Sequence, residues 1–321
     1  QEVDFRDLWG DHGIFTTMWI FGNPAKILFF KKHIKNLIKS LKVYKLYKPN
    51  IEKNIRKLIK LNIDKNKSYN HLLRVAVNRK MISVSLRKRI TPKLRFNLKL
   101  INYKRIDPKF KNLKYKFIIK QLSKLDNSCS DIGLKSNGKI LESGTSNIFL
   151  IKNNKIFSPK NGIYKGISYN FFKKKLGKII NKNIKVSSLN DYDEIILIGS
   201  GKGVASIQTI NDIRWKRKSL KFYRLLFSFY KKEILKCPQY KWILIMRDPN
   251  NPCLFCNTKE SGFIFENKLA YASYDTYPVS KLHCLIIPKR HIKDFFELTN
   301  EELVACNDLI KKVKEEIVKK D

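Results

Sequence analysis

The stretch ILESGTSNIFLIKNNKIFSP, residues 140–159, combines apolar runs with a turn of small polar residues. Short apolar runs bounded by Gly, Asn and Ser predict strands, here at 138–141, 147–151 and 155–157. Because the intervening turns are short, the three strands predict a meander. Glu142 stands at the end of the first run, directly before the small residues. Acids are scarce in this chain, so a carboxylate in this position indicates a functional site.

The same patterns predict alternating strands and helices on both sides of this stretch. Strands are predicted at 14–20, 26–30, 72–77, 81–86, 94–101 and 193–198, and helices at 31–46, 115–125, 166–180 and 219–236. The mixture predicts an α/β fold. Pro238 and the turn-rich DPNNP at 248–252 indicate a boundary near 237–250. We therefore expect a small α/β subdomain at 1–105, a larger subdomain at 106–237, and a separate α+β domain at 248–321.

The chain carries a formal net charge of +40, which by itself suggests nucleic-acid binding. The basic residues are mostly lysine and are spread along the whole chain, as an A/T-rich genome favours. We therefore do not expect nucleic acid as the main partner, although the charge should attract small anions. No apolar run reaches membrane-spanning length. Six cysteines with one close pair indicate a reducing, cytoplasmic environment.

Glu142 suits one kind of cofactor chemistry. A buried carboxylate can pair with the protonated nitrogen of a pyridine ring, which pyridoxal 5'-phosphate needs in order to act as an electron sink. The chain resembles the class IV, fold-type IV pyridoxal-phosphate enzymes, which include branched-chain and D-amino-acid aminotransferases and aminodeoxychorismate lyase. The matching elements, in order, lie at 12–20, 33–40, 142, 146–149, 158–159, 166–168 and 193–207. The resemblance covers about 10–215 and implies a two-domain fold, this cofactor and a homodimer.

The resemblance also implies a lysine, upstream of the glutamate, that attaches the cofactor as a Schiff base. Lys111 lies 31 residues before Glu142, and Lys114 lies 28 residues before it. Lys111 is favoured because Tyr115 follows four residues later, where the family has a tyrosine or leucine; Lys114 remains the alternative. Tyr115 is then expected near the ring, where its phenol could bond the 3-oxygen.

Two small-residue segments predict a phosphate site. Small residues let backbone N–H groups approach an anion, and a helix N-terminus adds a favourable dipole. Gly166-Ile167-Ser168 precedes a predicted helix, and Gly199-Ser200 follows the predicted strand at 193–198. The GSGKG at 199–203 lacks the spacing of a P-loop. We therefore expect these two segments to hold the phosphate of the cofactor.

One departure from the family leaves the function open. The family has an arginine for the phosphate three residues after the histidine of its first helix, and here Asn36 follows His33 at that spacing. Either Lys35 or another lysine replaces it, or the chain is a catalytically degenerate member. The resemblance implies an amino-acid aminotransferase or an aminodeoxychorismate lyase of the 4-aminobenzoate and folate branch. Replacing Glu142 by Ala is expected to abolish activity before it affects folding.

The C-terminal segment carries a second pattern. Cys253 and Cys256 form a C-x-x-C pair, which alone fits a zinc half-site or a redox pair. With ASYDTYPVSKLHCLIIPKRHI at 272–292 and LTNEEL at 298–303, the segment resembles the first half of a histidine-triad (HIT) nucleotide hydrolase or transferase. The resemblance implies that Asp275 binds ribose and that Cys253, Cys256 and His291 are zinc ligands. Leu282 stands where the family usually has glycine.

The catalytic histidines of that family would follow His291, and no histidine follows it here. We therefore expect no nucleotide hydrolysis by this segment and, with three of four ligands, less than one firmly bound zinc. Nucleotide or nucleic-acid binding through this segment and the positive charge is the alternative function. The chain lacks an initial Met and ends within a predicted helix, so we expect a fragment, a fusion, or two neighbouring genes read together.

Overall fold

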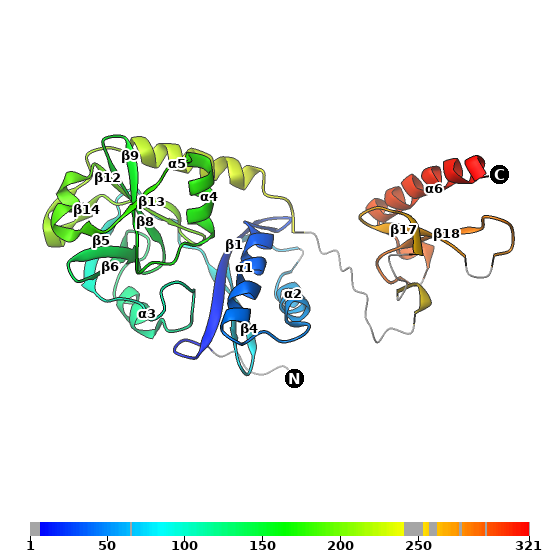
Figure 1. The fold of residues 1–321 in the computed structure, drawn as a ribbon, viewed down its shortest axis with the longest axis horizontal. Coiled ribbons are helices and arrows are strands. Elements are labelled where there is room, and N and C mark those ends of the chain that lie inside the picture. Colours follow the sequence, from blue (N-terminus) through cyan, green and yellow to red (C-terminus); the bar gives the residue numbers. More distant parts are fainter. Residues whose placement is uncertain are drawn as a thin grey trace. The chain divides into compact units, whose positions relative to one another are not determined.

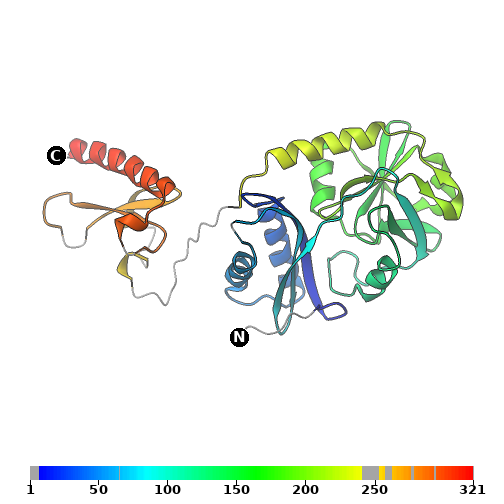
Figure 2. The ribbon, with the colours of Figure 1, turned by 180° about the vertical axis from the view of Figure 1, so that it is seen from behind.

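In the computed structural model the chain forms two compact units, Gln1–Tyr240 and Lys241–Asp321. The structure describes residues 7–64, 66–240, 253–256, 262–275, 278–292 and 294–320. Figures 1 and 2 show the two units from opposite sides, each with its own sheets and helices. Among the described helices, none has the length and apolar character needed to cross a membrane.

The N-terminal part of the first unit is an antiparallel sheet with two helices (Figure 1). The strand order is β2-β1-β3-β4, and β1 and β3 pair over ten residues each. Helix α1 packs against β1 and buries His33, Ile34, Leu37 and Leu41, which is the spacing of one face of a helix. The bounds are β1 Gly13–Gly22, β2 Lys26–Ile27, α1 Phe30–Val43, α2 Ile51–Leu61, β3 Tyr69–Asn78 and β4 Ile82–Lys88.

The rest of the first unit contains two further sheets. One has the order β10-β9-β8-β12-β13 and the other β11-β7-β6-β5-β14-β15. The strands are β5 Asn97–Asn102, β6 Ser130–Ser136, β7 Lys139–Ser143, β8 Asn147–Lys152, β9 Lys155–Pro159, β10 Ile180–Lys182, β11 Ile184–Lys185, β12 Glu194–Gly199, β13 Gly203–Ser206, β14 Thr209–Ile210 and β15 Trp215–Lys216. The helices are α3 Lys116–Leu122, α4 Ile167–Leu176 and α5 Lys221–Leu235.

Strands β8 and β12 are buried on both faces, which explains their continuous apolar sequences. Ile148 of β8 and Leu197 of β12 share a core with residues of the six-stranded sheet, such as Leu98. Phe149 and Ile196, on the other face, pack in a second core with α4 and α5. The five-stranded sheet is therefore held between the second sheet and two helices.

Two expectations about these elements need correction. The predicted meander is wrong, because β7 pairs with β6 and β11 in one sheet while β8 and β9 pair in the other. The predicted strand at 26–30 ends at Ile27, since Phe29 adopts a left-handed conformation and α1 begins at Phe30. The sequence patterns also missed α2, β6 and the short strands β10, β11, β13, β14 and β15. The turn after Glu142 therefore carries the chain from one sheet to the other.

The second unit has a three-stranded antiparallel sheet of order β16-β17-β18, with α6 packed against it (Figure 1). The bounds are β16 Phe263–Glu266, β17 Ala270–Tyr274, β18 Cys284–Pro288 and α6 Asn300–Lys320. Ala270 and Ala272 of the sheet and Leu309 and Val313 of the helix are buried. Helix α6 begins with a capping box, in which Thr299 and Glu302 each bond the other's backbone N–H.

Candidate active site

One cavity in the first unit collects residues from distant parts of the chain. The C-terminal ends of β7 and β12 and the N-terminus of α4 meet there, and Thr16 of β1 and His33 of α1 also line it. The eight residues predicted for the cofactor all line this cavity: Lys111, Tyr115, Glu142, Gly166, Ile167, Ser168, Gly199 and Ser200. Segments between residues 16 and 200 thus contribute to one site.

Glu142 is buried at the end of β7 and is held by two donors. Its Oε1 accepts a hydrogen bond from Arg105 Nε at 2.6 Å, and its Oε2 accepts one from the Tyr164 N–H at 3.1 Å. Burial raises the pKa of the Glu142 carboxyl, while Arg105 opposes that shift. Burial alone would lower the pKa of Arg105, but nearby Tyr115 and Glu142 raise it above its ordinary value. The two donors fix the orientation of the Glu142 carboxyl group at the wall of the cavity.

Lys111 reaches the same cavity because its segment runs beside β1. The Phe15 N–H donates to the Lys111 carbonyl at 2.9 Å, and the Lys111 ammonium lies 5.0 Å from the centre of the Phe15 ring. Burial, and to a lesser extent Arg105, lowers the pKa of Lys111 to about 8. The competing residue lies elsewhere, since the Lys114 amine donates to the Gly10 carbonyl at 2.8 Å in an exposed setting. A buried amine with a lowered pKa is the better nucleophile.

Tyr115 packs against Phe15 and Arg105. Its ring packs edge-on to Phe15 with centroids 5.2 Å apart, and the Arg105 guanidinium lies 5.4 Å from its centroid. Burial raises the pKa of Tyr115 to about 12, so the phenol stays protonated and can donate. The position is compatible with a hydrogen bond to a polar substituent of a ligand ring.

The two small-residue segments lie together at one side of the cavity. Ser168 Oγ and Ser200 Oγ are 3.4 Å apart, although the residues are 32 positions apart in sequence. Helix α4, which begins at Ile167, directs its N-terminus at this region. A Cβ on Gly199 would come within 2.7 Å of Ser146 Oγ, so this turn excludes a side chain. Two hydroxyls, a helix N-terminus and a tight turn make a suitable phosphate cup.

Sequence reasoning missed four residues that shape this site. Arg105 and Tyr164 hold Glu142, as described above, and the Tyr164 hydroxyl accepts a hydrogen bond from Asn36 Nδ2 at 2.6 Å. The fully buried Asp131 carboxylate forms an ion pair with Lys202, whose Nζ lies 3.2 Å from Oδ2. Arginine and acidic residues are scarce in this chain, and charged side chains are rarely buried without a partner. Their scarcity was the signal by which these residues could have been suspected.

The residues present fit pyridoxal 5'-phosphate. Lys111 offers an amine with a lowered pKa, and the Glu142 carboxylate can face a ring nitrogen. The two turns offer donors for a phosphate. One buried donor or acceptor, His33 Nε2, has no hydrogen-bond partner and belongs to a residue lining the same cavity. An unpartnered polar atom at the cavity wall fits a site for a polar ligand.

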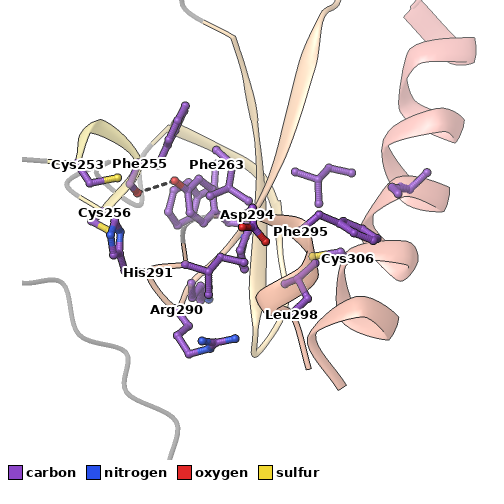
Figure 3. Close-up of a pocket in the computed structure, with 17 residues that line it drawn as sticks. Cys253, Phe255, Cys256, Phe263, Arg290, His291, Asp294, Phe295, Leu298 and Cys306 are labelled. Atoms are coloured by element: carbon purple, nitrogen blue, oxygen red, sulfur yellow. Dashed lines mark hydrogen bonds between the residues drawn. The ribbon is translucent and has the colours of Figure 1, made fainter. Parts of the chain in front are cut away.

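The second unit contains a group of potential metal ligands (Figure 3). One ligand atom from each of Cys253, Cys256 and His291 lies within 4.8 Å of the other two. Cys256 Sγ and His291 Nδ1 are 3.2 Å apart. Two thiolates and an imidazole are the donor set of a zinc site, so the three predicted ligands come together and fit that metal. They lie at the edge of a pocket that also contains Phe255, Phe263 and Cys306.

Asp275 lies at a different place in the second unit. It follows β17, where its backbone N–H donates to the His283 carbonyl at 3.0 Å and its Oδ2 lies 3.4 Å from His283 Nδ1. The pocket beside the cysteines is not lined by this residue. The structure thus brings the predicted metal ligands together but separates Asp275 from them.

Comparison with known proteins gives two family matches. The model of the family described as amino-transferase class IV matches residues 13–210, and the HIT domain model matches residues 257–321. An uncharacterised HIT-like protein of Mycoplasma pneumoniae is 35% identical over 68 residues, which are 20% of this chain and 47% of that protein. A HIT-like protein of Mycoplasma genitalium is 34% identical over 71 residues, 21% of this chain and 50% of that protein. The chain spans about half the length of these curated relatives.

Solved structures show the same fold as the first unit. A branched-chain aminotransferase of Thermoproteus uzoniensis aligns with a TM-score of 0.59 and 16% identity, over 73% of this chain and 91% of that one. A protein described as a putative 4-amino-4-deoxychorismate lyase from Legionella pneumophila aligns with a TM-score of 0.58 and 17% identity, over 72% of this chain and 96% of that one. At these identities the likeness concerns the fold alone.

Proposed function

The chain belongs to the class IV aminotransferase family, and from that premise we propose that the first unit is a pyridoxal-phosphate enzyme. It acts on an amino acid as an aminotransferase, or on aminodeoxychorismate as a lyase. The observation that carries this proposal is the cavity in which Lys111, Glu142 and two segments of small residues, 166–168 and 199–200, converge. A structural role alone would not require a buried lysine beside a buried arginine–glutamate pair.

Lys111 is the proposed attachment residue and proton carrier. Because its pKa is lowered to about 8 by burial, part of its amine is neutral near pH 7 and can act as a nucleophile or base. Glu142, held by Arg105, would pair as a carboxylate with the protonated ring nitrogen. Tyr115 would donate its phenolic hydrogen to a polar substituent of the ring. Pyridoxal phosphate, when bound, supplies the electron sink for the bond that breaks at the substrate's alpha carbon.

The turns at 166–168 and 199–200 are the proposed phosphate site. Ser168 and Ser200 offer hydroxyls, and the N-terminus of α4 offers backbone N–H groups. The family resemblance also supports a homodimer. In the second unit, which contains a HIT domain, we propose zinc binding by Cys253, Cys256 and His291, and nucleotide binding near Asp275.

Reconstitution with the cofactor tests the proposal directly. The purified full chain is mixed with pyridoxal 5'-phosphate, reduced with borohydride and digested, and the modified peptide is identified by mass spectrometry. We expect one stable modification at Lys111. The matched variants are Lys111→Ala, which should lose the modification, and Lys114→Ala, which should keep it. Modification at many surface lysines with none at Lys111 would refute the assignment.

Substrate assays separate the two reactions. The reconstituted protein is incubated with candidate amino acids and 2-oxoglutarate, and separately with aminodeoxychorismate, and the products are measured. Turnover of one class identifies the activity. A protein that carries the cofactor at Lys111 but turns over neither class would be the catalytically degenerate member that Asn36 leaves open.

A further inference from the structure

His33 is a buried histidine for which the proposed chemistry has no use. It lies in α1, is 4% exposed and lines the same cavity as Lys111. Its Nδ1 lies 2.7 Å from Thr16 Oγ1, whereas its Nε2 has no hydrogen-bond partner. Three other buried side-chain atoms in the described part of the chain share that condition, in Ser83, Ser158 and Tyr230. None of those three residues lines the cavity.

The ring of His33 is uncharged at neutral pH. Burial and the nearby Lys111 lower the pKa of His33 to about 3, so the ring carries a single N–H. If Thr16 donates its hydroxyl hydrogen to Nδ1, that N–H is on Nε2. A buried donor without an acceptor is costly, which makes an acceptor in the cavity the simplest partner.

Few positively charged side chains line the cavity, although the phosphate of the cofactor is proposed to bind there. Among the described residues that line it, Lys111 is the only lysine or arginine, and its amine is proposed for attachment. One helical turn beyond His33, Asn36 uses its side-chain amide to hold the Tyr164 hydroxyl. That hydroxyl has its hydrogen left to donate. The wall formed by α1 and Tyr164 therefore offers neutral donors and no added charge.

We propose that His33 is an anion-binding residue of this cavity, whose Nε2 hydrogen is donated to the phosphate group of the bound cofactor. This inference rests on the proposed function and assigns one of its contacts. Together with Ser168, Ser200 and the N-terminus of α4, His33 binds the phosphate through uncharged groups. Asn36, in this arrangement, is a positioning residue that acts through Tyr164.

Two substitutions at one position separate binding from folding. His33→Asn keeps a polar atom near Nδ1, which can still meet Thr16, but removes the donor at Nε2. His33→Gln places an amide N–H near the position of Nε2 and restores the donor. Affinities of each protein for pyridoxal 5'-phosphate and for pyridoxal, which lacks the phosphate, are measured by absorbance titration. Thermal melting confirms that both variants are folded.

We expect His33→Asn to weaken binding of pyridoxal 5'-phosphate about tenfold or more, as befits the loss of a hydrogen bond to a charged acceptor. Binding of pyridoxal should change by less than about twofold, and His33→Gln should regain most of the lost affinity. Equal weakening for both ligands, or none for either, would overturn the role of His33 while leaving the proposed function intact. Failure of the wild-type protein to bind either ligand would overturn the proposed function and this inference with it.

The hydrogen position can be measured independently. Nitrogen-15 NMR of histidine-labelled protein, with His33→Asn used to assign the signal, reports which ring nitrogen carries the hydrogen. We expect the hydrogen on Nε2 at neutral pH. A hydrogen on Nδ1 would overturn the proposal, because Nε2 would then be an acceptor facing an anion.

Discussion

At the scale of single residues, burial distinguishes one lysine from the many. Lys111 and Lys114 are three residues apart, and both fit the expected spacing before Glu142. The backbone of residues 111–113 bonds to Gly13 and Phe15 of β1, which places the Lys111 side chain in the cavity. The Lys114 amine instead bonds to the Gly10 carbonyl in an exposed setting. Desolvation then gives Lys111 the lowered pKa that the proposed chemistry needs.

The pH dependence of cofactor capture should show this lowered pKa. Only a neutral amine reacts, and the neutral fraction of Lys111 rises with pH through about 8. We therefore expect the rate of borohydride-trapped incorporation at Lys111 to rise about tenfold per pH unit below that value and to level off above about pH 9. Peptide-level mass spectrometry measures the rate. A rate that still climbs steeply at pH 10 would indicate an ordinary lysine.

The ion pair between Arg105 and Glu142 changes the expected result of removing the acid. Arg105 also donates to the carbonyl oxygens of Pro108 and Phe110, directly before Lys111. In Glu142→Ala its buried charge would lack the carboxylate. We expect a loss of about 3–5 kcal/mol in unfolding free energy, in addition to lost activity, so the expectation that folding is spared no longer stands. Urea denaturation measures it.

A second variant serves as the control for that change. Glu142→Gln keeps an acceptor for Arg105 and the overall shape, but removes the negative charge. We expect it to be more stable than Glu142→Ala and still to lose activity, because an amide cannot keep the ring nitrogen protonated. Full activity in Glu142→Gln would contradict the role assigned to the charge.

At the scale of elements, the site depends on the contacts that join the turn after β7 to the turn after β12. The turn after β7 crosses between sheets, and the turn after β12 returns along β13. Asp131 of β6 links them, because its Oδ2 accepts hydrogen bonds from Ser143 and Thr145 and lies 3.2 Å from Lys202 Nζ. Arg89 holds the second turn from outside through the carbonyl oxygens of Gly201 and Lys202. The turn after β12, which follows Gly199 and Ser200 of the proposed phosphate site, is therefore held by both the Asp131–Lys202 ion pair and Arg89.

Replacing Lys202 by Met should loosen this turn. The Asp131 side chain is fully buried and would lose its cation, so we expect roughly 3 kcal/mol less stability and weaker binding of pyridoxal 5'-phosphate. The matched control is Lys218→Met, whose amine lies 4.0 Å from Asp193 at the surface and should have little effect. Urea denaturation and cofactor titration measure both. Equal effects of the two variants would show that the Asp131–Lys202 ion pair does not hold the turn.

At the scale of the whole molecule, each of the two units contains one candidate site. The cavity of the first unit is built from residues 16–200, and the Cys253, Cys256 and His291 group lies within the second. Each unit has its own buried core. The proposed cofactor and metal sites should therefore respond separately to substitution.

Metal titration tests this separation. Cobalt(II), used as a spectroscopic substitute for zinc, should give thiolate absorption with the wild-type protein and none with Cys256→Ser. Cys306→Ser is the control, since Cys306 lines the same pocket without belonging to the three-residue group. Neither variant should change the affinity for pyridoxal 5'-phosphate. Loss of absorption in Cys306→Ser alone would show that the metal binds elsewhere.

Most helices and many strands of the first unit could be predicted from the sequence, because apolar periodicity reports which residues face a core, whereas β6 and several short strands were missed. Pairing could not be predicted in the same way. The sequence of residues 138–151 fits a meander as well as it fits the observed pairing. Only packing against β6 and β12 decides that Glu142 lies at the end of a strand in one sheet while Asn147 begins a strand of the other. Arg105, Tyr164 and Lys202 were not predicted, since no local pattern links them to residues 37, 22 and 71 positions away.

The sequence by itself determined the family of the first unit, the presence of a HIT domain and the short list of candidate residues for each proposed site. The order and spacing of the motifs along the chain carry that information. Only the tertiary structure decided which lysine is buried, what pairs with Glu142 and which atom of His33 is left without a partner. The physical reason is that pKa values and hydrogen-bond partners depend on distances between groups and on their exclusion from water. Those distances are set when sheets and helices pack, and they cannot be read from spacing along the chain.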